Sequence, residues 1–190
     1  MCRKVFAALL WLFMVNASYV SAETQTLDDA VKAINANVLF MRHALAPGFG
    51  DPESFTVKEC ATQRNLSDQG RDQARRIGAA LKQAGFAFDE VLSSEWCRCK
   101  ETARLLDLGD VQTFSGLNSF FQSHAPKHET LAILRRKLDG LSEDTFTLMV
   151  THQVVIQAIT SNSVSSGGLV AYNTFTQQAV SANTVFVTQH

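Results

Sequence analysis

Residues Asn37 to His43 read NVLFMRH, and the architecture of this chain can be worked out from them. The apolar run up to Met41 is typical of a short strand that is buried on both faces, as strands in the middle of a parallel sheet are. The run stops abruptly at an arginine and a histidine. A second run of this kind, TFTLMVTH from Thr145 to His152, also stops at a histidine. Both runs therefore indicate buried strands that end in side chains able to bind an anion or to exchange a proton.

Amphipathic helical segments separate the strands. The clearest begins at Ser67, a suitable cap, and places apolar or small residues from Ala74 to Leu81 at the i, i+3, i+4, i+7 spacing of a buried face. Gly85 lies where a glycine commonly ends a helix. The other expected elements are helix 27–36, strand 91–92, a helix capped by Ser94, strand 111–117, a helix from Pro126 to Gly140, helix 154–159, and strands 169–172 and 184–188. Because strands and helices alternate, we predict an α/β fold with three layers, α/β/α, around a mainly parallel central sheet.

The first 22 residues have the layout of a secretory signal peptide. Arg3 and Lys4 form a basic start, Val5 to Val15 are all apolar, and Val20-Ser21-Ala22 offers a small-residue cleavage site. The apolar run is shorter than the ~20 residues that span a bilayer. We therefore expect residues 1–22 to be removed and residues 23–190 to form one exported domain, periplasmic or secreted, with no stable membrane insertion. An uncleaved anchor is the alternative.

Composition excludes several classes of protein. With 190 residues, 46% of them hydrophobic and 18% charged, the chain has enough apolar content to fold around a core. Removing Arg3 and Lys4 from the 17 basic residues leaves 15 against 18 acidic ones, a net charge of −3. Such a balance argues against nucleic acid as a partner, although a local basic pocket is compatible with it.

Three cysteines remain if the signal segment is removed. An exported domain with Cys60, Cys97 and Cys99 can form one disulfide and keep one thiol, and we expect Cys60 to pair with Cys97 or Cys99. Three reduced, buried thiols are the alternative. A zinc site is not expected, since a Cys-x-Cys pair with one distant cysteine lacks the usual ligand spacing.

Three of the expected strands end in residues that suit an anion. The first ends in Arg42-His43, the second is followed by Arg98, and the fourth ends in His152. Because ligands of an open parallel sheet bind beyond the carboxyl ends of its strands, these side chains can converge. Arg98 also lies in the first turn of its helix, near the positive end of the helix dipole. The combination predicts a phosphate-sized anion site.

These motifs resemble those of the histidine phosphatase superfamily, the phosphoglycerate-mutase-like proteins. The segment from Leu39 to Ala44 is similar to the family's Arg-His-Gly signature, and Asn65-Leu66-Ser67-x-x-Gly70-x-x-Gln73-Ala74 to its next segment. Ser94-x-x-x-Arg98-x-x-x-Thr102-Ala103 is similar to its second-arginine motif, and Val150-Thr151-His152 to its second-histidine strand. The resemblance covers about residues 37–160 in the family's order.

The resemblance implies a phosphomonoesterase of phosphoglycerate-mutase-like fold. His43 would be the nucleophile that forms a phosphohistidine, and Arg42, Arg98 and His152 would clamp the phosphoryl oxygens. An imidazole with an ordinary pKa of about 6.5 is nucleophilic near neutral pH, and arginine holds phosphate oxygens in pairs. Since phosphoryl transfer depends mostly on positioning and charge stabilisation, we expect no metal and no cofactor. The substrate would be a phosphorylated small molecule or an envelope component.

Three positions depart from the family's pattern. Ala44 replaces the usual glycine, and Gln153 stands where the acid-phosphatase branch has an aspartate donor. Leu117-Asn118-Ser119 lacks the mutase branch's glutamate. A poor leaving group needs a general acid. Asp51, Glu53 and Glu129 are candidates from flanking loops; otherwise the substrate carries a good leaving group.

Several further residues have two interpretations each. Arg64 can contact phosphate or remain on the surface, and Asn118 can bind substrate or cap a turn. His124 and His128 indicate a solvated loop rather than a metal pair. Phe120-Phe121 line the pocket mouth or pack in the core. At the level of the whole protein, a non-catalytic phosphate-binding module is the alternative to a phosphatase, and a mutase is a third reading.

Overall fold

The computed structural model describes residues 26–182 of the chain. The expected signal segment 1–22 and the expected strand 184–188 lie outside the described residues. Within 26–182, the helices are all too short or too polar to cross a membrane.

A six-stranded sheet forms the middle layer, with the strand order β3-β2-β4-β1-β5-β6. The first four strands in this order are mutually parallel, and β5 and β6 continue the sheet antiparallel. In the central pair, Val38 lies beside Thr147 and Arg42 beside Thr151, so these two strands end together. The strands are β1 (Val38–Arg42), β2 (Glu90–Ser93), β3 (Val111–Thr113), β4 (Thr147–Thr151), β5 (Leu169–Tyr172) and β6 (Ala179–Ala182).

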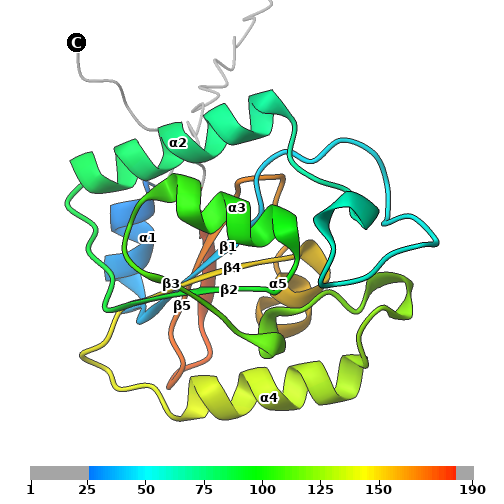
Figure 1. Cartoon of the computed structure of the whole chain (residues 1–190). Coiled ribbons are helices and arrows are strands. Elements are labelled where there is room, and N and C mark those ends of the chain that lie inside the picture. The colour runs from blue at the N-terminus through cyan, green and yellow to red at the C-terminus, as the bar shows by residue number, and fades with distance from the viewer. Residues whose placement is uncertain (1–25, 183–190) are drawn as a thin grey trace, which may run out of the picture.

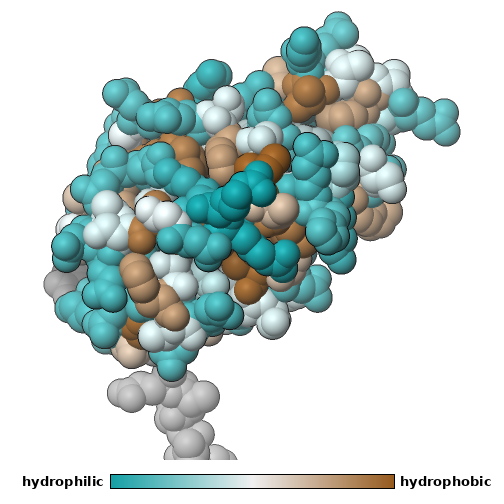
Figure 2. Space-filling model, turned by 90° about the horizontal axis from the view of Figure 1, so that it is seen from below, coloured by the Kyte–Doolittle hydropathy of each residue, from teal (hydrophilic) through white to brown (hydrophobic). Residues whose placement is uncertain are grey.

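Helices cover both faces of the sheet, as the predicted three-layer fold requires. In Figure 1, α1, α2 and α3 lie on one side of the sheet, and α4 and α5 on the other. Seen from the α4 side, the surface is mostly hydrophilic, with smaller hydrophobic patches between the polar side chains (Figure 2). The helices are α1 (Leu27–Ala33), α2 (Asp68–Gln83), α3 (Cys97–Leu106), α4 (Lys127–Asp139) and α5 (Gln153–Thr160), with 3₁₀ turns at Cys60–Thr62, Ser115–Leu117 and Phe121–Ser123.

Alternation along β1 divides the core into two halves. Leu39 and Met41 face α1, α2 and α3, whereas Val38 and Phe40 face α4 and α5. All four side chains are fully buried. The uninterrupted apolar run in β1 follows from this position, because a central strand covered on both faces has no solvent-facing side.

Helix α2 is built as its sequence predicts. The Ser67 hydroxyl accepts a hydrogen bond from the Gly70 backbone N–H, and Gly85 follows the helix with φ +81°. Gly78 lies against the backbone of Leu106, where a Cβ would collide with the Leu106 carbonyl group. The glycine therefore allows α2 and α3 to pack closely, which holds the start of α3 over the end of the sheet.

Several expected boundaries were wrong. Helix α1 ends at Ala33 rather than at residue 36, and strand β3 ends at Thr113 before a 3₁₀ turn. Strand β6 was not expected, because it is only four residues long and is only partly buried. Ser94 is not the cap of α3; the cap is Trp96, and the Ser94 side chain is used elsewhere.

Candidate active site

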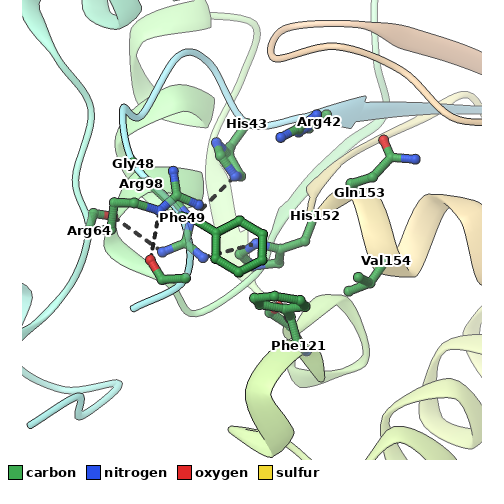
Figure 3. A pocket seen from close by; sticks show the side chains of 12 residues that line it. Arg42, His43, Gly48, Phe49, Arg64, Arg98, Phe121, His152, Gln153 and Val154 are labelled. Atoms are coloured by element: carbon green, nitrogen blue, oxygen red, sulfur yellow. Dashed lines mark hydrogen bonds between the residues drawn. The ribbon is translucent and has the colours of Figure 1, made fainter. Parts of the chain in front are cut away.

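The predicted convergence of strand ends is present. Arg42 and His43 end β1, His152 follows β4, and Arg98 lies in the first turn of α3, directly after β2. Figure 3 shows their side chains gathered around one cavity of about 230 Å³. The cavity is lined by Arg42, His43, Gly48, Phe49, Gly50, Arg64, Arg98, Ser119, Phe121, His152, Gln153 and Val154.

His43 is held in a form that suits nucleophilic attack. Its Nδ1 lies 2.8 Å from the Ala44 carbonyl oxygen, which can only accept, so Nδ1 carries the proton. The lone pair is then on Nε2, 3.3 Å from the Nε–H of Arg98. Burial, followed by the charge of Arg98, lowers the His43 pKa to about 3. The ring is therefore neutral at physiological pH, with Nε2 available.

Arg98 is fixed by a buried aspartate. Its two terminal nitrogens donate to the two carboxylate oxygens of Asp51 at 2.8 and 3.1 Å, and both side chains are 3% exposed. One further N–H donates to the Arg64 carbonyl oxygen at 3.2 Å. The other donors are directed to the histidines: Nε to His43, and one terminal nitrogen to Nδ1 of His152 at 3.4 Å. The bonds to Asp51 are short and paired, whereas those to the rings are long. The donors facing the rings are thus the ones that a phosphate oxygen can take.

His152 is oriented by a chain of hydrogen bonds behind the cavity. Since a guanidinium only donates, Nδ1 facing Arg98 is the acceptor, and Nε2–H donates to the Ser94 hydroxyl at 3.0 Å. The Ser94 hydroxyl donates to Asn118 Oδ1 at 3.2 Å. Burial, then the charge of Arg98, holds the pKa of His152 well below its ordinary value. A second neutral imidazole therefore faces the same point.

Asn118 does not occupy the place expected of a substrate-binding residue. Its Oδ1 accepts from Ser94 and from the Glu95 N–H, and its Nδ2 donates to the Glu95 carboxylate. It lies behind the cavity lining, because the 3₁₀ turn that ends at Leu117 directs it toward β2. Asn118 supports His152 through Ser94, which also explains why Ser94 is not a helix cap.

Arg42 and Arg64 supply further positive charge. Arg64 donates to the carbonyl oxygens of Gly50 and Ala46, and Arg42 donates to that of Val164 at 2.9 Å. Burial, then repulsion from Arg98, lowers the pKa of both guanidinium groups. The Nε of Arg42 is buried without a hydrogen-bond partner in the described part of the chain. Of the two interpretations of Arg64, the structure favours the pocket.

The ionised side chains around the cavity carry a net charge of +2. Three guanidinium groups, of Arg42, Arg64 and Arg98, are opposed by the single carboxylate of Asp51, a balance of +2. Asp51 lies behind the lining, on Arg98, and the lining itself contains no carboxylate among residues 26–182. Buried positive charge without a counter-ion is costly, and a phosphate dianion would balance it.

The candidates for a general acid are not placed for that role. Burial raises the pKa of Asp51, but hydrogen bonds from Arg98, the Arg64 N–H and Trp96 outweigh it and hold that pKa below its ordinary value. Asp51 is therefore ionised and fixed on Arg98. Glu53 and Glu129 are exposed and lie outside the cavity lining. Ser119 lies in the lining, so that wall carries a hydroxyl instead of the mutase branch's glutamate.

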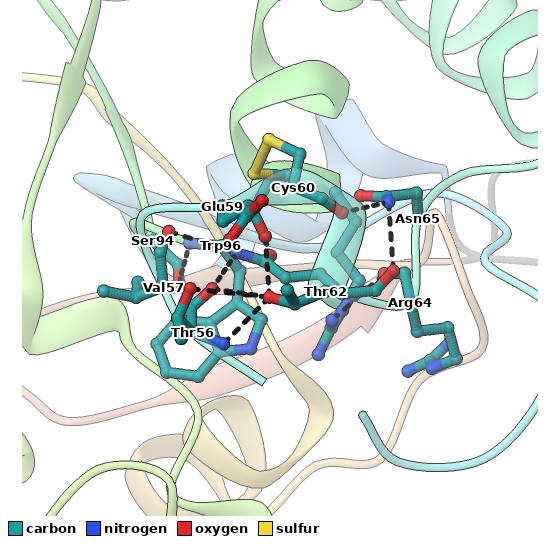
Figure 4. The surroundings of a disulfide bond; sticks show 12 residues. Thr56, Val57, Glu59, Cys60, Thr62, Arg64, Asn65, Ser94 and Trp96 are labelled. Atoms are coloured by element: carbon teal, nitrogen blue, oxygen red, sulfur yellow. Dashed lines mark hydrogen bonds between the residues drawn. A yellow bond between two sulfur atoms is a disulfide. The ribbon is translucent and has the colours of Figure 1, made fainter. Parts of the chain in front are cut away.

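The expected disulfide joins Cys60 to Cys97, one residue before Arg98. Figure 4 shows the bond beside the loop that contains Thr62 and Arg64. Gln63 in the same loop accepts a hydrogen bond from the Cys97 N–H at 2.9 Å. Cys99 remains a buried thiol, 3.4 Å from His152 Nε2, and burial raises its pKa to about 12. The disulfide ties the loop that supplies Arg64 to the start of α3.

Other expectations are resolved by packing. His124 packs against Phe55, with ring centroids 4.3 Å apart, and its Nε2 is buried, so the expected solvated position is wrong for this histidine. His128 is exposed on α4, as expected. Phe121 lines the cavity, whereas Phe120 packs against the core on the α4 side. Sequence reasoning missed Phe49 as a cavity residue and Asp51 as the anchor of Arg98. The only signal for either was a loop rich in glycine and proline.

The fold and the site together define a protein of the phosphoglycerate-mutase-like class. Residues 38–120 match the family model described as "Histidine phosphatase superfamily (branch 1)". Over these residues, which include Arg42, His43 and Arg98, the chain is similar to the histidine phosphatase superfamily, in agreement with the motifs of that segment.

Two solved structures of phosphatases are similar to this chain over about three quarters of its length. The protein histidine phosphatase SixA, solved with tungstate, is 16% identical with a TM-score of 0.52, over 77% of this chain and 94% of that one. A mycobacterial glucosyl-3-phosphoglycerate phosphatase is 13% identical with a TM-score of 0.50, over 77% and 96%. These identities support the fold.

A curated relative matches over a shorter stretch. The 2,3-bisphosphoglycerate-dependent phosphoglycerate mutase 1 of Nitrosomonas europaea is 47% identical over 53 residues. That match spans 28% of this chain and only 20% of the mutase. The comparisons together support a phosphatase or mutase-type enzyme.

Proposed function

We propose that this chain is an exported phosphomonoesterase that forms a phosphohistidine on His43. One observation carries the proposal: a neutral imidazole presents its Nε2 lone pair to a cavity where three guanidinium groups and one carboxylate leave a charge of +2. This arrangement suits a phosphate monoester dianion next to a nucleophile. The substrate is a phosphorylated small molecule or an envelope component.

Two displacements on phosphorus complete the reaction. Nε2 of His43 attacks phosphorus and the ester P–O bond breaks, so the leaving oxygen departs with the electron pair. Water then attacks phosphorus, the N–P bond breaks, and His43 returns to its neutral form. Arg42 and Arg98 hold the phosphoryl oxygens, and Asp51 keeps Arg98 in position. His152 joins them when its Nδ1, which faces Arg98 as an acceptor, takes up a proton in the presence of the phosphate dianion. Positioning and charge stabilisation are the main contributions that phosphoryl transfer requires.

The direct test is His43→Gln, which keeps the size and a hydrogen-bonding group but removes the nucleophile. Release of phosphate from p-nitrophenyl phosphate should fall to background, and an alkaline trap of enzyme incubated with ³²P-labelled substrate should lose its label. His128→Gln is the matched control, because that histidine is exposed on α4. Full turnover by the His43→Gln protein would refute the proposal.

A phosphate-binding module without turnover is the second candidate. It is favoured by the absence of any carboxylate from the cavity lining of residues 26–182; Asp51 lies behind the lining and acts on the site only through Arg98. This candidate predicts saturable binding of inorganic phosphate or vanadate with no labelled histidine. A phosphohistidine at residue 43 would eliminate it.

Export is the cellular part of the proposal. It is supported by the basic, apolar and small-residue segments of residues 1–22 and by the Cys60–Cys97 disulfide, since disulfides persist in oxidising compartments. Expression of the full chain with a C-terminal tag tests it. We expect an N-terminus at Glu23 in the periplasmic or secreted fraction; an intact N-terminus in the cytoplasm would contradict export.

A further inference from the structure

Two phenylalanines stand at the mouth of the phosphate cavity. Phe49 is 88% exposed and Phe121 is 36% exposed, and both line the cavity. Their rings meet edge to face, with centroids 5.1 Å apart and an interplanar angle of 85° (Figure 3). Together with Phe175, they are the large exposed hydrophobic side chains of residues 26–182. We call Phe49 and Phe121 the aromatic pair.

The backbone around the aromatic pair is built to keep it exposed. Gly48 and Gly50, on either side of Phe49, have φ values of +94° and +69°. Gln122, next to Phe121, accepts a hydrogen bond from the Asp51 N–H at 2.8 Å. A Cβ on Gly50 would collide with the Gln122 side chain. Two loops distant in sequence are thus tied together directly behind the two rings, and Asp51 ties them in turn to Arg98.

The rest of the mouth offers little to a sugar. Apart from the charged clamp, the polar side chains of the lining are His43, His152, Ser119 and Gln153. The Ser119 hydroxyl accepts from the Phe121 N–H, and the Gln153 oxygen accepts from the Val164 N–H at 3.0 Å. Nε2 of Gln153 is the amide donor of the lining that has no partner among residues 26–182. Val154 adds another apolar wall. A hydroxyl-rich group would meet mainly hydrocarbon here, whereas a flat ring would contact aromatic faces and edges.

Within residues 26–182 the cavity lining holds no carboxylate, which points to the same chemistry. Without a general acid, the P–O bond breaks readily only if the leaving oxygen is a weak base, as a phenolate is and a sugar alkoxide is not. Accordingly, we infer that the substrates of this site are aryl phosphates, monoesters whose ester oxygen is attached to an aromatic ring that packs on Phe49 and Phe121. This inference rests on the proposed function and adds the class of leaving group to it.

The reaction on an aryl phosphate balances without further reactants. The bond between phosphorus and the phenolic oxygen breaks as the His43 Nε2–P bond forms, and the phenolate leaves with the electron pair. Water attacks the phosphohistidine and the N–P bond breaks. The proton that water releases ends on the phenolate, giving the phenol and inorganic phosphate.

Binding of phosphonates tests ring recognition separately from leaving-group chemistry, because the P–C bond does not break. Phenylphosphonate, cyclohexylphosphonate and methylphosphonate are titrated into the protein by calorimetry, in buffer where all three are dianions. We expect phenylphosphonate to bind about tenfold more tightly than methylphosphonate and about threefold more tightly than cyclohexylphosphonate. Equal affinity for the phenyl and methyl compounds would overturn the inference, and so would equal affinity for the phenyl and cyclohexyl compounds.

Variants of the aromatic pair test whether the phenyl ring of the ligand packs on Phe49 and Phe121. Phe49→Ala and Phe121→Ala should each weaken phenylphosphonate binding about fivefold to tenfold and leave methylphosphonate binding within about twofold. Phe49→Leu, which keeps an apolar side chain, should lose the discrimination between phenyl and cyclohexyl. Phe175→Ala is the matched control, since Phe175 is 54% exposed in the turn between β5 and β6 and lies outside the cavity lining. An equal loss for the phenyl and methyl compounds in the Phe49 and Phe121 variants would contradict the inference.

Failure of the proposed function gives a different result. If the wild-type protein releases no phosphate from any monoester while phenylphosphonate still binds selectively, the site recognises aryl phosphates without hydrolysing them. If hydrolysis proceeds through His43 but the three phosphonates bind equally, the phosphatase stands and the aryl preference is wrong.

Discussion

At the carboxyl ends of the parallel strands, which we call the cationic edge, buried side chains retain positive charge and unused hydrogen-bonding capacity. At the opposite ends, which we call the amide edge, two buried amide side chains are hydrogen-bonded within the protein. Opposite the site, Asn37 donates to Ser142 O and Thr174 Oγ1 and accepts from the Thr174 N–H. Asn173 likewise uses both sides of its amide, donating to the carbonyl oxygens of residues 34 and 35. Both amides are buried.

Burial alone does not distinguish these two regions. His43, Arg98 and His152 are as buried as Asn37, yet they face a cavity, and their contacts with one another are 3.3 to 3.4 Å long. Native proteins rarely bury polar groups without good partners, so loosely paired ones indicate a ligand. The amide side chains of the amide edge therefore stabilise the fold, whereas the side chains of the cationic edge are arranged to bind an anion.

Arg98→Lys should break the cationic edge most severely. A lysine ammonium cannot contact Asp51 and both histidines at once in the planar geometry of the guanidinium. We expect kcat/KM for p-nitrophenyl phosphate to fall about 10³-fold. Arg104→Lys, an exposed position on the same helix, is the control. A fall of less than tenfold would mean that Arg98 does not act on the phosphoryl group.

Asn37→Ala, at the amide edge, should lower the stability of the protein and leave its activity unchanged. It leaves the Thr174 N–H and other buried groups without partners, so the free energy of unfolding should fall by about 2 kcal/mol. Denaturant titration measures this, and activity per folded molecule should remain unchanged. A selective loss of activity without a loss of stability would show that the two edges are not separate in function.

Asp51→Asn separates a positioning role from a proton donor. If Asp51 orients Arg98, the substitution should lower kcat/KM about tenfold by the same factor for aryl and alkyl phosphates. A general acid would instead show a much larger loss on alkyl phosphates, because only these need a proton on the leaving oxygen. The ratio of the two losses is the measurement.

The pH dependence of stability reports on the histidines of the cationic edge. His43 has its pKa lowered to about 3, by burial and then by Arg98, while the unfolded chain has the ordinary value near 6.5. The unfolded state therefore binds more protons between these values, so the free energy of unfolding should fall as pH drops from about 6.5 toward 3. The His43→Gln protein should show a shallower dependence. An unchanged slope would mean that His43 is protonated in the folded state.

The local periodicity of the sequence predicted most of the fold and part of the site. The apolar runs of β1 and β4, the cap at Ser67 and the glycine at residue 85 each act through neighbouring residues, so they can be read from one strand or helix. The convergence of Arg42, His43, Arg98 and His152 followed from the rule that parallel strands end together. Short, half-exposed segments such as β6 carried no comparable signal.

Long-range contacts could not be predicted in the same way. Asn118 was expected to bind substrate, but a turn places it against Ser94 and Glu95, 24 and 23 residues earlier. Asp51 was considered as an acid, but its pairing with Arg98 spans 47 residues. Their roles depend on which loops meet, and loop conformation has no periodic pattern.

By itself, the sequence determined the layered α/β fold, the place of the candidate site at the carboxyl ends of the strands, and the residue types there, which suit an anion. These follow from short-range patterning and from the geometry of parallel sheets. Only the tertiary structure decided that Cys97 rather than Cys99 is the partner of Cys60, that Asp51 fixes Arg98, and that Phe49 meets Phe121 at the cavity mouth. The physical reason is that each of these contacts joins segments far apart in the sequence, and the loop conformations that bring them together leave no periodic pattern.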